Sequence, residues 1–397
     1  MKAIVFHALG DIRLDEVSEP TIESDTDAVV RLTRSAICGT DLHFIRGTMA
    51  GVEPGTILGH EGVGIVESLG DGVRNFKVGD RVVVPSTIGC GYCSYCRAGY
   101  YAQCDNANPN GPGTAFYGGP KEAGGLHGMQ AEKVRVPFAN VNLVKLPEEV
   151  SDDEAILISD IFPTGYFGAD MAGIKPGHTV AVFGCGPVGQ FAIASAKLFG
   201  AGRVFAVDRH ADRLDMAREQ GAETVDFSKE DPVETIKRLT GGIGADSVID
   251  AVGVDAEMPH SGPAEASKAA GSAKDASPSA RDEGDAWRAG DGPAQALTWA
   301  VDAVAKAGTI SIIGVYPPSD TMFPIGAAMN KNLTVRMGNC NHRKYVPMLV
   351  ELVRSGQMVP TKILTQREPM GHAIEAYERF DHRQPGWIKV ELEPSSS

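Results

Sequence analysis

The sequence has no excess of basic residues: 37 lysines and arginines stand against 51 aspartates and glutamates, which gives a formal net charge of −14 at pH 7. A nucleic-acid partner requires a basic face that neutralises phosphates, so this charge balance argues against one. The chain also lacks internal repeats and coiled-coil heptads. A globular fold with its own hydrophobic core is therefore expected.

A secretory signal is also missing, because no basic segment followed by an apolar run opens the sequence. The most apolar stretch, residues 179–196, is interrupted by a Gly-Cys-Gly-Pro turn, which predicts a strand and a helix instead of a membrane span. We therefore expect a cytoplasmic protein with no membrane partner. The 397 residues suffice for two domains, and 43% hydrophobic and 22% charged residues are ordinary for a globular protein.

Cysteine is scarce, yet four of the seven cysteines crowd into one short segment. Cys90, Cys93 and Cys96 are spaced as C-x-x-C-x-x-C, and Cys104 follows after seven intervening residues. In a large chain without a secretory signal, this spacing favours metal binding over a disulfide framework. Four thiolates suit a closed, tetrahedral structural zinc site. An iron–sulfur cluster is the competing interpretation, and it would colour the protein.

Hydrophobic patterning divides the chain into parts of different texture. Residues 1 to about 150 contain short runs such as AVVRLTR, GVGIVESLG and DRVVVPS, which predict strands separated by turns. From about residue 180, strands such as TVAVFG and RVFAVD alternate with helices such as VGQFAIASAKLFG. Such alternation predicts a parallel sheet covered by helices on both faces.

Periodicity stops between residues 254 and 293, where Ala, Ser, Gly and charged residues leave little to bury. We interpret this segment as a surface insertion. After it, QALTWAVDAVAKAG predicts a helix, TISIIGV and residues 333–337 predict strands, YVPMLVELVRSG predicts another helix, and WIKVELE predicts a last strand.

A dinucleotide-binding pattern follows the strand 179–183. Gly184, Gly186 and Gly189, with Pro187 and Val188 between them, form G-x-G-x-x-G at the start of a helix. The first glycine allows a tight turn, the second lets the backbone approach a pyrophosphate, and the third lets helix and strand pack closely. The helix N-terminus offers N–H groups to the phosphates.

Asp208 closes the next strand, about twenty residues further on, where a carboxylate accepts hydrogen bonds from both ribose hydroxyls. This favours NAD over NADP, because the carboxylate repels a 2′-phosphate. Arg209 weakens the preference, since an arginine there can accommodate that phosphate. We also expect Arg213 and Val315 to contact the cofactor.

Further metal-binding residue types are scattered along the chain. Cys38 lies in CGTDLH, and His60 and Glu61 lie in GHEGVG. Taken alone, Cys38 is a small buried hydrophobe and His60 a core histidine. Together with the cysteine segment and the dinucleotide pattern, they resemble the zinc-containing medium-chain dehydrogenase family. Gly59-His60-Glu61 with Gly64, Gly70 and Val73 reproduces its G-H-E-x-x-G-x5-G-x-x-V signature.

The resemblance implies an α/β protein of two domains. A β-rich GroES-like catalytic domain spans 1–160 and resumes at 326–397, and a Rossmann domain with a doubly wound parallel sheet spans 161–325. The insertion 254–293 falls outside the resemblance.

The resemblance also implies a catalytic zinc ion held by Cys38, His60 and a third residue just before the Rossmann domain. No cysteine lies there, and the segment ISDIFPTGYFGA offers Asp160. An aspartate at this place looks like the formaldehyde dehydrogenase branch, which includes glutathione-independent enzymes that keep NAD bound. The alternative is that Asp160 caps the helix beginning near Phe162 and that Glu61 is the third ligand.

Other residues receive roles by the same resemblance. Thr40 matches the hydroxyl beside the zinc-bound oxygen, and His43 matches the solvent-side base of a proton relay. Taken alone, Thr40 would be interpreted as a turn-capping threonine and His43 as an exposed polar residue. Glu61 is a possible alternate zinc ligand, and Asp41 is expected to orient His60. Lys389 falls where the family places a cation for the cofactor pyrophosphate.

We therefore expect two zinc ions per chain, NAD, and a small alcohol or aldehyde as substrate. An aldehyde dismutase that never releases NAD is the nearest alternative, and a polyol or amino-alcohol dehydrogenase is another. A zinc-free reductase or an inactive relative is a different class, which Cys38, His60 and Asp160 argue against. The resemblance implies a homodimer or homotetramer.

Overall fold

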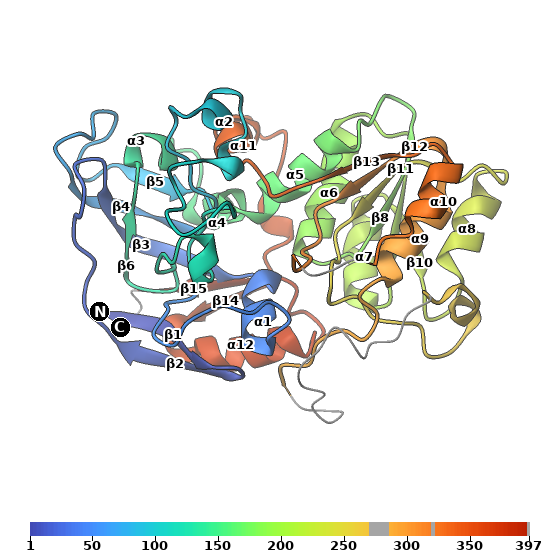
Figure 1. The fold of residues 1–397 in the computed structure, drawn as a ribbon, viewed down its shortest axis with the longest axis horizontal. Helices are drawn as coiled ribbons and strands as arrows, with labels where there is room; N and C mark the ends of the chain where they lie inside the picture. Colours follow the sequence, from blue (N-terminus) through green and yellow to red (C-terminus); the bar gives the residue numbers. More distant parts are fainter. Residues whose placement is uncertain (270–285, 319–321, 395–397) are drawn as a thin grey trace. The chain divides into compact units, whose positions relative to one another are not determined.

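The computed structural model describes residues 1–269, 286–318 and 322–394, which form two compact units (Figure 1). Among these residues, the first unit contains 1–163, 286–287 and 340–394. The second contains 164–269, 288–318 and 322–339. No helix in the described ranges is both long and apolar enough to cross a membrane.

The first unit is rich in strands, as its alternating hydrophobic runs predict. A seven-stranded sheet has the order β14-β15-β3-β4-β5-β7, with β6 also paired to β3, and β1 and β2 form a separate hairpin. All neighbours in the larger sheet are antiparallel except β14 and β15. The strands are β1 (Lys2–Ala8), β2 (Asp11–Glu16), β3 (Ala28–Ile37), β4 (Gly62–Leu69), β5 (Arg81–Val84), β6 (Lys133–Val136), β7 (Val144–Lys145), β14 (Gln366–Pro369) and β15 (Val390–Glu393).

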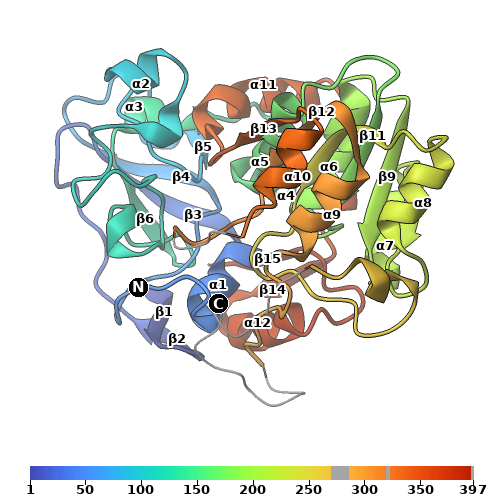
Figure 2. The same ribbon diagram turned by 45° about the vertical axis from the view of Figure 1, so that its right-hand side comes forward.

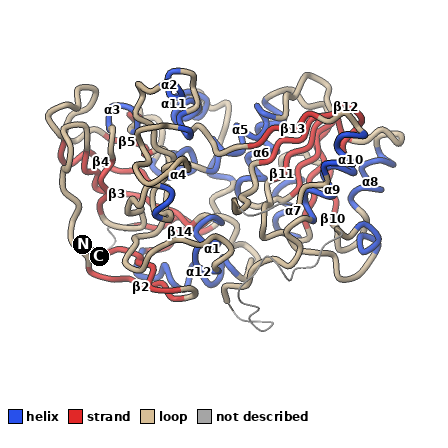
Figure 3. The backbone as a smooth tube through the Cα atoms, in the orientation of Figure 1, coloured by secondary structure: helices blue, strands red, loops and turns tan. Residues whose placement is uncertain are grey.

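Most helices of the first unit are short, but α11 has 13 residues. Figure 2 shows α12 beside β14 and β15. Figure 3 shows that the chain after β5 is mostly loop around α2. The helices are α1 (Gly39–Arg46), α2 (Ser94–Arg97), α3 (Ala139–Asn142), α4 (Asp152–Ser159), α11 (His342–Arg354) and α12 (Ala373–Asp381), with short 3₁₀ turns η1 (Tyr101–Gln103), η2 (Lys121–Ala123), η5 (Pro360–Lys362) and η6 (Met370–His372).

The second unit is a parallel sheet of order β10-β9-β8-β11-β12-β13. Helix α6 packs on β8 and β9, α9 packs on β11 and β12, and Figure 1 shows helices on both sides of the sheet. The elements are α5 (Ile161–Met171), β8 (Thr179–Phe183), α6 (Pro187–Leu198), β9 (Arg203–Asp208), α7 (Ala211–Glu219), β10 (Glu223–Asp226), α8 (Pro232–Leu239), β11 (Ala245–Asp250), η3 (Pro263–Ser267), α9 (Gln295–Ala303), β12 (Val304–Ile312), α10 (Ile325–Asn330) and β13 (Thr334–Met337).

This strand order reverses direction at one point in the sheet. The chain moves from β8 outward to β9 and β10, and then returns to β11 on the other side of β8. Open parallel sheets bind ligands at the carboxyl ends of the strands where the order reverses. Both predicted domain types are therefore confirmed: a β-rich domain and a doubly wound parallel sheet.

Three details differ from the sequence prediction. The last domain boundary falls between residues 339 and 340, not at 326, because β13 pairs with β12 and so belongs to the parallel sheet. The helix predicted over QALTWAVDAVAKAG ends at Ala303, where β12 begins. The insertion 254–293 does bury side chains, among them Val254, Ala264 and Trp287; its residues 270–285 lie outside the described ranges.

Candidate active site

The site in the first unit begins where β3 ends. Cys38 is the N-cap of α1, and its backbone N–H donates to the carboxylate of Asp41, three residues later, at 3.0 Å. This local hydrogen bond fixes the backbone at the start of α1. The Cys38 side chain there points inward and is buried. His60 and Glu61 immediately precede β4, and Asp160 follows the last residue of α4. Each chemical group thus stands at the end of a regular element.

Four of these side chains come together. The ligand atoms of Cys38, His60, Glu61 and Asp160 all lie within 4.8 Å of one another, and all four residues are buried. Asp160 Oδ2 is 3.6 Å from Cys38 Sγ and 3.4 Å from His60 Nε2. Two ligand atoms at 2.0–2.3 Å from a tetrahedral zinc ion lie about 3.3–3.8 Å apart. The distances from Asp160 Oδ2 to the other two donors therefore match those expected around one zinc ion.

The two carboxylates of this cluster differ in their partners. Glu61 accepts two hydrogen bonds of 2.6 Å from the ammonium of Lys389. Asp160 turns Oδ2 toward Cys38 and His60, and its Oδ1 accepts a hydrogen bond of 2.8 Å from His342. Asp160 is thus the carboxylate whose oxygen faces the other two donors, whereas the oxygens of Glu61 are engaged by a lysine.

The protonation of the cluster suits a cation. Burial opposes the ionisation of Asp160, but hydrogen bonds from His342 and His60 hold the pKa of its carboxyl well below the usual value. Burial raises the pKa of the Cys38 thiol. A metal ion binds the thiolate form, so a bound cation offsets this effect of burial at Cys38.

Lys389 differs from its predicted role. Its side chain is fully buried in the first unit, and Nζ donates to both oxygens of Glu61 and to the carbonyl of Ile37 at 2.9 Å. An ammonium group has three donors, and these three acceptors use all of them. In this structure Lys389 therefore forms an ion pair beside the predicted zinc ligands in place of the predicted contact with the cofactor pyrophosphate.

Thr40 and His43 stand three residues apart on α1, a spacing that places them on one face of the helix. His43 is not the exposed polar residue that it would be if taken alone, because only 6% of its surface is accessible. Its Nδ1 lies 3.0 Å from the hydroxyl of Thr48 just beyond the helix. Thr48 thus fixes the ring orientation, and the relay remains a prediction.

Buried polar groups lie behind His60 and Cys38. Asp41 Oδ1 lies 3.3 Å from His60 Nδ1 without forming a hydrogen bond, so the orienting role of Asp41 stays a prediction. Asp41 Oδ2 accepts from Gln130 Nε2 at 3.1 Å, and Gln130 Oε1 accepts from the Tyr377 hydroxyl at 2.8 Å. Neither Gln130 nor Tyr377 stands near a motif, so no pattern in the sequence identified them.

The four cysteines of the loop also converge. The sulfur atoms of Cys90, Cys93, Cys96 and Cys104 lie within 4.8 Å of one another and form no disulfide. The Sγ atoms of Cys93 and Cys104 are 3.9 Å apart, close to the separation of two thiolates on one zinc ion. Burial opposes the ionisation of Cys93, but backbone N–H donors outweigh it and lower the pKa of its thiol to about 7. This donor set fits a closed metal site.

The predicted dinucleotide loop has the geometry its glycines imply. Gly184 adopts a left-handed φ of +88°, and a Cβ on Gly189 would lie 1.9 Å from the carbonyl oxygen of Gly184. A Cβ on Gly186 would meet only the guanidinium of Arg213, at 3.7 Å, so this face of the loop stays open for a ligand. Pro187 and Val188 begin α6. All residues of this helix are described, and no side chain forms a capping hydrogen bond at its N-terminus.

Asp208 lies at the carboxyl end of β9, next to this loop. Its Oδ2 accepts from the backbone N–H of Cys185 at 2.8 Å, and its Oδ1 accepts from the N–H groups of Arg209 and His210. The Arg209 guanidinium is paired at 2.5 Å with Glu257, in the insertion. Val315 follows β12 and accepts a hydrogen bond from Val254 at the same edge of the sheet.

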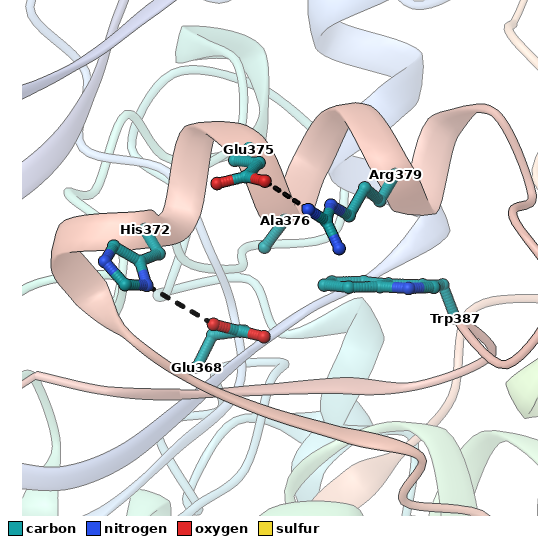
Figure 4. A pocket seen from close by; sticks show the side chains of 6 residues that line it. All are labelled: Glu368, His372, Glu375, Ala376, Arg379 and Trp387. Atoms are coloured by element: carbon teal, nitrogen blue, oxygen red, sulfur yellow. Dashed lines mark hydrogen bonds and ion pairs between the residues drawn. The ribbon is translucent and has the colours of Figure 1, made fainter.

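A shallow hollow elsewhere in the first unit has another character. Its charged groups pair among themselves: His372 Nδ1 is 3.5 Å from Glu368, and Arg379 pairs with Glu375 and stacks on the ring of Trp387 (Figure 4). No predicted site residue lines it, so the hollow is separate from the candidate active site. The residues that line it are Glu368, His372, Glu375, Ala376, Arg379 and Trp387.

Comparison with known families agrees with the two units. Residues 24–148 match the alcohol dehydrogenase GroES-like domain, and residues 187–261 match the zinc-binding dehydrogenase family. The first match covers Cys38, His60 and the four-cysteine loop, and the second begins at the first residue of α6.

Individual relatives extend over nearly the whole chain. An uncharacterised zinc-type alcohol dehydrogenase-like protein of Bacillus subtilis is 39% identical over 99% of this chain and 100% of its own. A glutathione-independent formaldehyde dehydrogenase of Pseudomonas aeruginosa is 35% identical over 85% of this chain and 80% of its own.

Solved structures lead to the same family. The alcohol dehydrogenase TADH from Thermus sp. ATN1 superimposes with a TM-score of 0.81 at 35% identity, covering 99% of both chains. The resemblance inferred from CGTDLH, GHE and the four cysteines is thereby confirmed. The chain belongs to the zinc-containing medium-chain alcohol dehydrogenase family and is an oxidoreductase.

Proposed function

We propose that this protein oxidises a small alcohol or a hydrated aldehyde with NAD, at a zinc ion held by Cys38, His60 and Asp160. The observation that carries the proposal is the spacing of the three donors: 3.4 and 3.6 Å from Asp160 Oδ2 to the nitrogen and sulfur match a tetrahedral zinc site. Three protein ligands leave a fourth position for the substrate, as in catalytic zinc sites generally.

The side chains around the site divide the chemistry among them. Zinc, when bound, polarises the substrate oxygen and lowers the pKa of its hydroxyl. The glycine loop and Asp208 would hold and orient NAD, which would supply the hydride acceptor when bound. Thr40 Oγ1 takes the hydroxyl proton, and His43 Nε2 passes it on, because Nδ1 is engaged by Thr48.

NAD is the cofactor that the second unit favours. The buried Asp208 carboxylate is ionised, because Arg213 and backbone N–H donors lower its pKa against the opposing effect of burial. A 2′-phosphate placed beside it is repelled. Arg209, the residue that could offset this repulsion, is already paired with Glu257. Release of Arg209 by Glu257→Gln should raise kcat/KM for NADP relative to NAD, and an unchanged ratio contradicts this assignment.

A second zinc ion in the four-cysteine loop serves structure. The four sulfur atoms occupy all positions of a tetrahedral ion, so no position remains for a substrate. We propose two zinc ions per chain on this basis.

Formaldehyde is the substrate suggested by one relative. The formaldehyde dehydrogenase of Pseudomonas aeruginosa is 35% identical to this chain, and an aspartate as third ligand resembles that branch. An enzyme that dismutates aldehydes without releasing NAD is the alternative. It is distinguished by stoichiometric NAD in the purified protein and by turnover that needs no added cofactor.

A homodimer or homotetramer is the proposed assembly. In the described part of the parallel sheet, β13 is an edge strand that pairs only with β12. Met337 on this strand and Ile325 and Met329 on the preceding helix are 62%, 66% and 72% exposed. Exposed apolar side chains beside an open strand edge favour pairing with a second copy. Light scattering in solution tests this, and a monomer at all concentrations contradicts it.

The proposed function is tested by purifying the protein without added cofactor. Metal analysis, nicotinamide absorbance and a panel of small alcohols and aldehydes are then measured on the wild type and on Cys38→Ser. We expect about two zinc ions per wild-type chain, one in the variant, and NAD reduction by the wild type alone. Zinc-free protein, or turnover that survives in Cys38→Ser, contradicts the proposal.

A further inference from the structure

We propose that His342 is the positioning residue that aims Asp160 at the catalytic zinc ion, an inference that rests on the zinc site proposed above. The sequence did not point to His342, which is the first residue of α11 and lies far along the chain from every zinc-binding motif. The structure places it directly behind Asp160.

The carboxylate of Asp160 has two distinct sides. Oδ2 faces Cys38 Sγ and His60 Nε2 at 3.6 and 3.4 Å. Oδ1 points the other way and lies 2.8 Å from His342 Nε2. One oxygen thus serves the metal position while the other is held by the imidazole, so the carboxylate binds through a single oxygen in a fixed orientation.

The direction of this hydrogen bond follows from the groups involved. An ionised carboxylate only accepts hydrogen bonds, so Nε2 of His342 carries a proton and donates it to Asp160. The other ring nitrogen, Nδ1, lies 3.0 Å from the hydroxyl of Thr87. The imidazole is therefore held at both nitrogens, which fixes the ring plane and the direction in which Nε2–H points.

The surrounding backbone keeps His342 and Asp160 in register. The hydroxyl of Thr87 lies 3.0 Å from the carbonyl of Cys340, two residues before His342. The adjacent residue, Ser86, donates its N–H at 3.1 Å to the carbonyl of Ser159, just before Asp160. One short segment after β5 therefore anchors both partners of the His342–Asp160 hydrogen bond.

A further anchor comes from the four-cysteine loop. Asn341, next to His342, accepts a hydrogen bond of 2.9 Å from the backbone N–H of Ala102. Ala102 lies in η1, between the cysteines Cys96 and Cys104. The structural metal loop thus supports the start of α11, from which His342 reaches the catalytic site.

Burial makes the loss of this donor consequential. His342 and Asp160 are only 2% and 7% exposed, so water does not readily replace the imidazole. Partners that orient a metal ligand change metal affinity or activity by about 10–100-fold when removed. Removal of the imidazole leaves Oδ1 without its donor and lets the carboxylate rotate away from the metal.

The test compares two amides that differ in reach. In His342→Gln, the amide nitrogen can occupy the place of Nε2 and donate to Asp160, whereas in His342→Asn it reaches only the place of Nδ1. Zinc release from each holoenzyme to a coloured chelator is followed, with Asp160→Ala marking the phase that belongs to the catalytic site. The exposed His372→Asn is the matched control.

We expect zinc to leave the catalytic site about 10–100-fold faster in His342→Asn than in the wild type, and His342→Gln to stay within about threefold of the wild type. In the cobalt-substituted enzyme, the visible spectrum should shift in His342→Asn and stay close to that of the wild type in His342→Gln. Equal zinc release and equal spectra for both amides and the wild type overturn the assignment of His342.

The zinc site itself is judged separately. If Asp160→Ala retains all its zinc with unchanged release, the proposed ligand set is wrong, whatever the His342 variants do. If Asp160→Ala loses its catalytic zinc while His342→Asn behaves as the wild type, only the positioning role fails.

Discussion

Replacement of Lys389 by an uncharged residue removes the charge that balances the buried carboxylate of Glu61, beside the proposed zinc ligands. Lys389 and Glu61 are both fully buried, and the ammonium lies 2.6 Å from each carboxylate oxygen. In Lys389→Met the apolar stem is largely preserved, so the principal loss is the counter-charge of Glu61. Breaking a buried ion pair in this way costs about 3–5 kcal/mol, because one charge stays buried and unpaired.

The expected effect on melting follows from the size of the unit. A change of 1 kcal/mol shifts the melting temperature by about 2–4 °C in a domain of 150–250 residues. The variant should therefore melt about 6–20 °C below the wild type. Burial raises the pKa of Glu61 to about 7 even with Lys389 present. Lys389 lowers this pKa, so its loss raises the pKa of Glu61 further in the variant, and protonation of Glu61 then offsets part of the lost stability. The difference in melting temperature should therefore grow as the pH rises above 7, and it is followed across that range.

Two variants serve as controls in the same melting experiment. Lys389→Met combined with Glu61→Gln removes the unpaired charge and should recover most of the lost stability. Lys229 also lies 2.6 Å from a carboxylate, that of Asp226, but its side chain is 79% exposed. Lys229→Met should therefore change the melting temperature little. A Lys389→Met protein that melts within about 2 °C of the wild type refutes the reasoning.

Three further predictions concern other residues. Cys38→Ser should abolish turnover with little loss of stability, whereas Cys96→Ser should lower the melting temperature, because closed zinc sites contribute folding energy; equal melting of the two variants contradicts separate zinc roles. Asp208→Ala should raise the KM for NAD more than it lowers kcat and should narrow discrimination against NADP, and a wild type that prefers NADP refutes this. Burial raises the pKa of Glu391 from 4.5 to about 7, so its contribution to stability is full below about pH 4.5 and is lost as pH rises to about 7, a change of up to about 3 kcal/mol. Glu391→Gln should flatten this part of the pH–stability curve, and an unchanged curve argues against the burial of Glu391.

The parts of the fold that sequence predicted best are those with a local physical cause. The run from Thr179 through Gly189 to Asp208 specifies strand, turn, helix and second strand from hydrophobic period and glycine placement alone. The four cysteines likewise lie within one loop, so their spacing already limits what they can form.

The meeting of Cys38, His60 and Asp160 could not be predicted from local sequence patterns alone. Cys38, His60 and Asp160 stand at the ends of three separate elements, and no periodicity brings them together. Only the resemblance to a known family predicted their meeting, and it also placed Lys389 at the cofactor. A single lysine just before a strand carries no local sign of its partner, and its pairing with Glu61 depends on how the antiparallel sheet is assembled.

His342 shows the same limit. It reaches Asp160 from the start of α11, and its position depends on hydrogen bonds to Thr87 and, through Asn341, to the cysteine loop. The domain boundary was predicted at residue 326 and lies at residue 340, for a related reason. The strand Thr334–Met337 belongs to the parallel sheet because it pairs with β12. The sequence of one short strand does not indicate which strand it pairs with.

The most direct test of the proposed active site is a crystal structure of the zinc-loaded protein with anomalous diffraction at the zinc edge. We expect two anomalous peaks per chain, one among the four cysteines and one beside Cys38 and His60, with an Asp160 oxygen about 2.0–2.2 Å from the second. A second peak that is absent, or that is bound by Glu61 with Asp160 beyond hydrogen-bonding distance, would contradict the proposed ligand set.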